Sequence, residues 1–268
     1  MPLYRSDSVV LRTYKLGEAD RIVVFYTRNR GKVRAVAKGV RRTKSRFGAR
    51  LEPGSIVHVQ FYEGRNLDIV TQAETVERLG LLRSDLGRYG RAALILETID
   101  HLTEEGEANP ALYRLLTGVL AELDREGNPL VLPAFVAKLL VLEGVQPLLE
   151  HCANCGSEGP LVALALHLGG VVCRECRQGD PISDDARIAL QLVLDGRVRH
   201  VLDTTPAPVA AELEAISSKL LEQHLERRLR SASVLYHHLQ DPQLQAEQPD
   251  PVELPDRVEP APVESPTS

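Results

Sequence analysis

The 268-residue chain contains no tryptophan, a single methionine and only 4% aromatic residues. Its apolar residues occur in short runs, all well below the roughly 18 that a membrane-spanning helix needs. The opening residues, Met1 to Asp7, contain no apolar run of the length found in a secretory signal. We therefore expect a cytoplasmic protein that makes no membrane contact.

Motifs of the common enzyme classes are missing as well. The sequence contains no GxxxxGKS or GxxxxGKT phosphate loop, no GxGxxG dinucleotide turn, no GxSxG nucleophile elbow and no HExxH metal-binding helix. The zinc-deaminase pattern of a His or Cys with Glu, followed by PCxxC, is not met either. These absences predict that the protein is not an enzyme and has no catalytic residues.

All four cysteines lie close together, in the motifs Cys152-Ala153-Asn154-Cys155 and Cys173-Arg174-Glu175-Cys176. Disulfides that staple a secreted protein would be spread more widely, so the clustering favours a metal site in a reducing compartment. Two CxxC turns supply four thiolates for tetrahedral Zn²⁺, which leaves no coordination position for a reactive water. We therefore predict one structural Zn²⁺ in a zinc ribbon; reduced core cysteines or a redox pair would not explain the doubled spacing.

The formal net charge of −5 conceals a strong asymmetry along the chain. Residues 1–80 contain 16 Lys and Arg against 8 Asp and Glu, whereas residues 81–240 contain 15 against 22 and residues 241–268 contain 1 against 7. Clustered cations release the counterions condensed on a phosphate backbone, so affinity depends on local rather than net charge. The first 80 residues are therefore the expected nucleic-acid-binding part; the simpler alternative is a solvated basic face.

The cations are densest between Gly31 and Arg50. The first half of this stretch alternates between basic and apolar residues, which predicts a strand with cations on its open face. The second half predicts a basic loop, in which Phe47 is a candidate for stacking on a base. The candidate nucleic-acid contacts are Lys32, Arg34, Lys38, Arg41, Arg42, Lys44, Arg46, Phe47 and Arg50.

Five short segments rich in β-branched and aromatic residues precede residue 80, with turns containing Gly, Asn or Pro between them. They predict strands at residues 8–14, 21–26, 32–38, 55–62 and 68–71. Five strands without a helical period favour a small barrel of the OB type over an SH3-like barrel. We therefore predict an OB-fold nucleic-acid-binding domain over residues 1–79.

From about residue 80 the apolar residues follow the helical period, and Gly and Pro mark the helix ends. We expect helices from Leu86 to near Gly106, from Pro110 to near Gly127, at 134–143, from Ser183 through Val193, and from Val209 to about Leu239. Residues 80–240 are thus predicted to form a helical domain, interrupted at about 148–180 by the zinc insert. Residues 241–268 hold seven of the 17 prolines and are expected to be a disordered acidic tail. The predicted fold class is α+β.

Several stretches are distinctive beyond their composition: Ala37-Lys38-Gly39-Val40-Arg41-Arg42-Thr43-Lys44-Ser45-Arg46-Phe47-Gly48, Phe61-Tyr62-Glu63-Gly64, Leu67 to Glu74, Asp7 to Leu11 and Gly17 to Asp20. Together with the order of barrel, helices and four-cysteine insert, they resemble the bacterial recombination mediator family RecO. The resemblance covers about residues 5–240. It implies a nucleoid-associated DNA repair protein with an OB fold and no nuclease or ATPase activity.

The resemblance also implies partners. Members of the RecO family bind single- and double-stranded DNA, anneal complementary strands and, with RecR, help load RecA onto single strands coated by single-stranded-DNA-binding protein (SSB). The acidic C-terminal tail of SSB docks on the mediator, where Lys138, Arg227 and Arg228 are candidate contacts. Some members lack the four cysteines, so the implied zinc supports the local fold rather than the shared activity.

Two other classes remain open from the residues alone. A zinc-ribbon protein that binds RNA or assists transcription would use the ribbon for a protein partner and the barrel for RNA. A metal-dependent nuclease would cleave DNA in the presence of magnesium. The sequence contains no signal for recognition of the 2′-hydroxyl, which would distinguish RNA from DNA.

Overall fold

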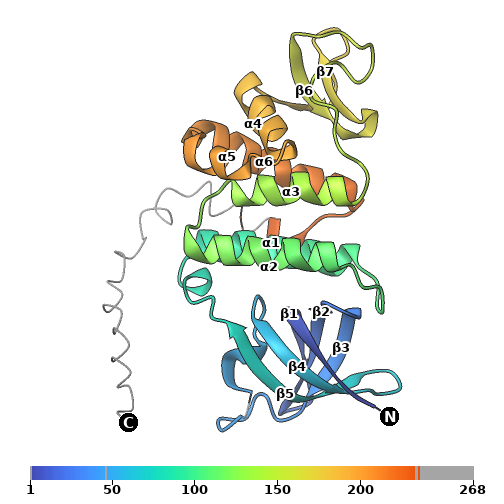
Figure 1. Cartoon of the computed structure of the whole chain (residues 1–268), viewed down its shortest axis with the longest axis vertical. Helices are drawn as coiled ribbons and strands as arrows, with labels where there is room; N and C mark the ends of the chain where they lie inside the picture. Colours follow the sequence, from blue (N-terminus) through green and yellow to red (C-terminus); the bar gives the residue numbers. More distant parts are fainter. Residues whose placement is uncertain (1, 46, 233–234, 236–268) are drawn as a thin grey trace, which may run out of the picture.

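The computed structural model describes residues 2–45, 47–232 and 235. A β-barrel lies at one end of the molecule, a small sheet lies at the other, and the helices occupy the space between them (Figure 1). Arg46 and the predicted acidic tail, residues 241–268, lie outside the described residues. Within the described part, no helix combines the length and the apolar content that crossing a bilayer requires.

The barrel consists of five strands: β1 Leu3–Leu16, β2 Asp20–Thr27, β3 Gly31–Ala37, β4 Ile56–Tyr62 and β5 Asp68–Glu77. They pair in the order β1-β2-β3-β5-β4, and β4 closes the barrel by pairing with β1. Only the β3–β5 pair is parallel among them. The predicted five-stranded OB-type barrel is confirmed, although β1 and β5 are longer than their apolar patterns indicated.

The middle of β1 and the second half of β2 are buried on both faces. Val10, Val23 and Phe25 point into the barrel, where they join its own core. Val9, Leu11, Val24 and Tyr26 occupy the alternate positions and belong to the core of the helical domain. Burying each such apolar side chain stabilises the fold by about 1.5–3 kcal/mol, so this wall holds the barrel against the helices.

The connection between the first two helices fixes the other side of the barrel. Gly31 has a positive φ of 63°, and a Cβ at this position would lie 1.9 Å from the Glu107 carbonyl oxygen. The Gly106 N–H donates to the Lys32 carbonyl oxygen at 3.2 Å. Only glycine fits at residue 31, because it tolerates both the left-handed backbone and the close approach of the other segment.

The helices are α1 Leu86–Leu102, α2 Pro110–Arg125, α3 Val131–Leu142, α4 Asp184–Leu194, α5 Val198–Thr204 and α6 Ala207–His224. The Asn109 side chain accepts from the N–H groups of Ala111 and Leu112, and Ser183 accepts from that of Ala186. These caps agree with the starts predicted for α2 and α4. The α5 helix was not predicted, because seven residues are too few to show a clear helical period.

The prediction of one long helix from Val209 to about Leu239 is wrong. The α6 helix ends at His224, and Glu226 takes a φ of 51° in the turn that follows. The Glu97 carboxylate on α1 then accepts from the backbone N–H groups of Arg230 and Ser231, where helical structure resumes. This cap comes from a distant element, so the local apolar period gave no sign of the break.

Three further strands form a separate sheet: β6 Leu161–Ala165, β7 Gly170–Cys173 and β8 Asp180–Pro181.

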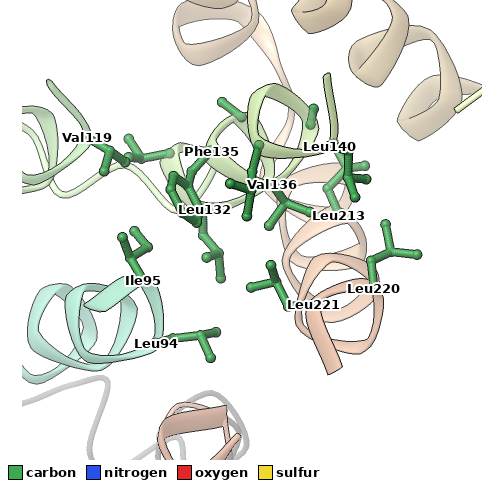
Figure 2. Close-up of a cluster of buried hydrophobic side chains, with 14 of the residues drawn as sticks. Leu94, Ile95, Val119, Leu132, Phe135, Val136, Leu140, Leu213, Leu220 and Leu221 are labelled. Atoms are coloured by element: carbon green, nitrogen blue, oxygen red, sulfur yellow. The ribbon is translucent and has the colours of Figure 1, made fainter. Parts of the chain in front are cut away.

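The main helical core lies between α1, α2, α3 and α6. Figure 2 shows side chains from these four helices meeting there: Leu94, Ile95, Val119, Leu132, Phe135, Val136, Leu140, Leu213, Leu220 and Leu221.

A buried ion pair crosses this core. Arg91 of α1 and Glu214 of α6 are 8% and 1% exposed, and two guanidinium nitrogens face the two carboxylate oxygens. The Nη2–Oε2 distance is 3.0 Å. Such a pair fixes the position of α6 on α1, because either charge alone would lie unpaired in an apolar environment.

We predict that Glu214→Ala lowers the free energy of unfolding by about 3–5 kcal/mol, because it leaves the Arg91 charge buried without its partner. Arg199→Ala is the matched control, since Arg199 pairs with Glu126 at 3.0 Å on an exposed surface, and its loss costs at most about 1 kcal/mol. Urea unfolding of both variants checks the prediction. Equal losses would show that the buried pair does not hold α6.

Candidate functional site

The basic loop, residues 38–50, connects β3 to β4 and lies against the turn between β1 and β2. The Gly39 N–H donates to Asp20 Oδ1 at 2.7 Å, and the Arg41 N–H donates to the Ala19 carbonyl oxygen at 3.0 Å. The loop then enters a single 3₁₀ turn at Gly48–Leu51. These backbone contacts hold the loop at one end of the barrel, so its side chains project from a fixed framework.

Three of the predicted contacts are exposed cations without internal partners. Lys38, Arg42 and Lys44 are all exposed, and within the described residues none of their side chains has a hydrogen-bond or ion-pair partner. Arg41 is exposed as well, but its Nη1 donates to the Glu18 carbonyl oxygen at 3.1 Å. Arg50 is exposed at the end of the loop, with Nη1 at 3.4 Å from the Phe47 carbonyl oxygen.

The prediction of an open cationic face on β3 is wrong for Lys32, whereas Arg34 is exposed. The Lys32 side chain is only 15% exposed, and its ammonium donates to the Asp100 carbonyl oxygen on α1 at 2.7 Å. Arg34 pairs with Glu105 at 3.5 Å. This face of β3 turns toward the acidic end of α1 and the segment after it, a tertiary contact that the strand period does not reveal.

The prediction that Phe47 stacks on a base is also wrong. Its ring is 1% exposed and belongs to the barrel core together with Leu51. The short 3₁₀ turn that carries Leu51 covers one end of the barrel, and Phe47 enters the core beside it. The Phe47 ring therefore packs in the barrel core although its neighbours in the loop are polar, and neither face of the ring is accessible to a nucleotide.

Sequence reasoning missed a basic groove beside the loop. Arg50 from the loop, Arg78 after β5 and Arg83 line a groove of about 430 Å³, with Glu77 as its acidic member. The Arg83 Nη2 donates to Ser55 Oγ at 2.7 Å, which fixes its guanidinium. Arg78 is exposed and has no side-chain partner within the described residues. Only the fold brings Arg78 and Arg83 to Arg50, because these two arginines lie outside the dense basic stretch of the sequence.

The four cysteines meet at the end of the molecule opposite the barrel. Their sulfur atoms all lie within 4.8 Å of one another, and Cys155 Sγ lies 3.8 Å from Cys173 Sγ. A tetrahedral site with Zn–S bonds of about 2.3 Å has sulfur atoms about 3.8 Å apart. The Asn154 side-chain amide donates to Cys176 Sγ at 3.2 Å, as an outer hydrogen bond to a metal-bound thiolate would. The donor set therefore fits a metal ion.

The shifts in the pKa values of two of the thiols are also compatible with a metal site. Burial opposes ionisation of Cys152, but hydrogen bonds from the backbones of Cys173, Cys155 and Asn154 outweigh it and lower its pKa to about 6. For Cys155, a backbone hydrogen bond from Ser157 lowers the pKa, whereas the neighbouring thiols raise it to about 12. Neighbouring thiols thus oppose one another's ionisation, and a cation among them favours the thiolate forms.

We predict one metal ion per chain in protein purified without chelator, measured by native mass spectrometry and elemental analysis. Cys173→Ser should remove it, because three thiolates bind the ion far more weakly. His167→Ala is the control in the same insert, since His167 is exposed and contacts Gln178 at 3.2 Å rather than the cysteines. Metal retained by the cysteine variant, or absent from the unaltered chain, would contradict the assignment.

By fold and site, the chain is an OB-fold protein with a basic loop and a four-cysteine centre. Two family models match it in succession: Recombination protein O N terminal over residues 1–79 and Recombination protein O C terminal over residues 83–233. DNA repair protein RecO of Frankia casuarinae is 44% identical over 243 residues, which cover 88% of this chain and 99% of that protein. The chain therefore belongs to the recombination protein O family, and the resemblance drawn from its sequence is confirmed.

Proposed function

We propose that this protein binds single- and double-stranded DNA through the basic loop and anneals complementary strands during recombinational repair. The observation that carries the proposal is the set of exposed cations in the loop, Lys38, Arg42 and Lys44, which have no partner among the described residues. Unpaired cations are available to replace the counterions of phosphates, whereas Lys32 and Arg34 already face carboxylates. Membership of the family supports the assignment to DNA repair.

The DNA path runs from the loop into the adjoining groove. Arg50 belongs to both, and Arg78 adds a further unpaired cation beyond it. Arg41 acts differently, because its bonds to carbonyl oxygens of the β1–β2 turn make it a residue that positions the loop. The cations follow a backbone without reading bases, which suits a protein that handles strands of any sequence.

Annealing requires no catalytic group. The protein neutralises two phosphate chains enough for them to approach, and it binds each loosely enough for the bases to pair. With Phe47 buried, the described part of the basic loop offers no ring on which a base would be held. Contact through phosphates alone leaves the base edges free for a complementary strand, and we therefore infer a mediator without enzymatic activity.

The helical domain provides the surface for protein partners. We infer that RecR and, indirectly, RecA act with this protein on SSB-coated strands. The acidic SSB tail fits a groove of about 410 Å³ between α2, α3 and α5, which joins an apolar floor to the cations Arg114 and Lys138. Of the candidate contacts named from the sequence, Lys138 lines this groove, whereas Arg227 donates to His101 at 3.1 Å elsewhere.

For the four-cysteine centre we infer Zn²⁺, because four thiolates in a tetrahedron are its preferred structural ligands. Cys152, Cys155, Cys173 and Cys176 would hold the ion, which when bound stabilises the insert. The centre lies at the far end of the molecule from the basic loop, which is consistent with a structural role (Figure 1).

We predict that the double variant Arg42→Glu and Lys44→Glu weakens binding to single-stranded DNA on the order of tenfold at low salt. The loss of two phosphate contacts should also make the slope of log affinity against log salt shallower by about 1 for each contact. Fluorescence anisotropy with a labelled oligonucleotide at several salt concentrations measures both quantities.

Arg65→Glu is the matched control for this experiment. Arg65 is an exposed cation without a described side-chain partner, in the turn before β5 and at the opposite end of that strand from Arg78. Arg78→Glu should weaken binding and Arg65→Glu should not. Equal effects of the two variants would mean that charge anywhere on the barrel suffices and that the loop and groove form no defined path.

We predict that the protein accelerates pairing of SSB-coated complementary strands without nucleotide and without cleaving them. Fluorescence energy transfer between labelled strands measures pairing, and a gel of the same reaction with magnesium detects cleavage. Preference for RNA of the same sequence would support a zinc-ribbon RNA-binding or transcription accessory protein instead. Shortened strands would support a nuclease, and either outcome would overturn the proposed function.

A further inference from the structure

One acidic stretch has no place in the function proposed above. Residues 241–268 contain seven carboxylates and one arginine, and they include Asp250-Pro251-Val252-Glu253-Leu254-Pro255-Asp256. Acidic and apolar residues alternate within these seven residues. A surface that receives them must therefore offer both unpaired cations and an apolar floor.

The groove between α2, α3 and α5 offers both. Its floor includes Leu115 and Val119 of α2, Phe135 of α3 and Leu202 of α5. At its rim, Arg125 and Arg199 are already neutralised, since both pair with Glu122 and Glu126.

The two remaining cations of the groove differ from that pair. Within the described part of the chain, the side chains of Arg114 and Lys138 have neither a hydrogen-bond nor an ion-pair partner. They lie on neighbouring helices, α2 and α3, and line the same groove as the apolar floor. Two unpaired cations beside an apolar surface match a peptide that combines carboxylates with Val and Leu.

We propose that the chain's own residues 250–256 bind in this groove. Val252 and Leu254 cover its apolar floor, and the carboxylates of Asp250, Glu253 and Asp256 neutralise Arg114 and Lys138. The inference rests on the proposed function in one respect, since it makes the chain's own segment a competitor for the site assigned to the acidic SSB tail.

The alternative site within the chain is the basic loop, and it fits the segment less well. Lys38, Arg42 and Lys44 provide charge, but the ring of the loop, Phe47, is buried in the barrel. The loop would neutralise the carboxylates and leave Val252 and Leu254 in water. Removing these two apolar side chains from water favours the groove over the loop.

The segment is long enough to reach the groove. Leu235 packs beside Gly90 of α1, where a Cβ at Gly90 would lie 3.3 Å from the Leu235 side chain. Fourteen residues lie between positions 235 and 250, and the fifteen steps from one Cα to the next span up to about 50 Å. The α2 helix, with 16 residues, is about 24 Å long, so the groove lies within reach from α1.

When the chain's own segment occupies the groove, a partner must displace it in order to bind there. A tethered segment has an effective concentration in about the millimolar range, so even weak binding competes with a partner that is free in solution. A partner that presents many acidic tails at once, as a coated DNA strand does, displaces the segment more readily than a single free tail. The groove thus favours assembled complexes over isolated partner molecules.

The test compares the full chain with a full-chain variant that carries Asp250→Asn, Glu253→Gln, Leu254→Ser and Asp256→Asn. The probe is a fluorescein-labelled synthetic peptide of residues 248–258, and its binding is followed by anisotropy. We expect the variant to bind the probe about fourfold more tightly than the unaltered chain, because its own segment no longer competes. Adding Arg114→Glu and Lys138→Glu to the variant should abolish probe binding, whereas adding Arg42→Glu should leave it unchanged.

Each result has a defined consequence. Equal affinity of the unaltered chain and the variant, or loss of probe binding through Arg42→Glu alone, overturns the proposal. Circular dichroism and metal content of the groove variant show whether it is folded, and Lys138→Gln provides a milder change with the same expected direction. A parallel titration with a peptide of the SSB tail separates the two inferences: if that peptide fails to bind while the 248–258 probe binds as expected, only the assignment of the SSB site is wrong.

Discussion

The burial of β1 and β2 on both faces is the constraint on which the rest of the molecule depends. A barrel strand normally has one face in the barrel and one in water, but Val9, Leu11, Val24 and Tyr26 are covered by the helical domain. This contact removes one wall of the barrel from solvent and turns β3 toward α1. The exposed cations of the loop from β3 to β4 and of the adjoining groove lie outside this contact, and they carry the proposed DNA path.

Ion pairs between the barrel and α1 occupy some of the basic residues of the barrel and leave others exposed to solvent. Asp100 of α1 is 5% exposed and lies against Lys32, while Arg12 Nε approaches Asp100 Oδ2 to 2.7 Å at an angle that forms no hydrogen bond. The cations near α1 therefore compensate a buried carboxylate, whereas Lys38, Arg42 and Lys44 of the loop face water without a partner among the described residues. The basic residues of the barrel thus have two roles. Those beside α1 stabilise the fold, and the exposed ones of the loop are the proposed contacts to DNA.

The sequence predicted the elements better than it predicted their surroundings. Segments rich in β-branched and aromatic residues between turns located all five barrel strands, and the caps Asn109 and Ser183 located the starts of α2 and α4, because these signals are local. The two CxxC motifs likewise predicted that four sulfur atoms lie close together, as they do in the structure. Lys32, Phe47 and the end of α6 were predicted wrongly, since their environments come from Asp100, the barrel interior and Glu97, which are distant along the chain. Arg78 and Arg83 could be joined to the basic loop only through the fold.

The close approach at Gly31 has a mechanical consequence. With the Glu107 carbonyl occupying the space of a side chain on one side and the apolar wall of β1 and β2 on the other, the barrel is held at two separate points. Two such points restrict the hinge motion that a single linker would allow between the barrel and the helices. In the annealing proposed above, the two strands would then bring their bases into register on a surface whose barrel and helices are held together.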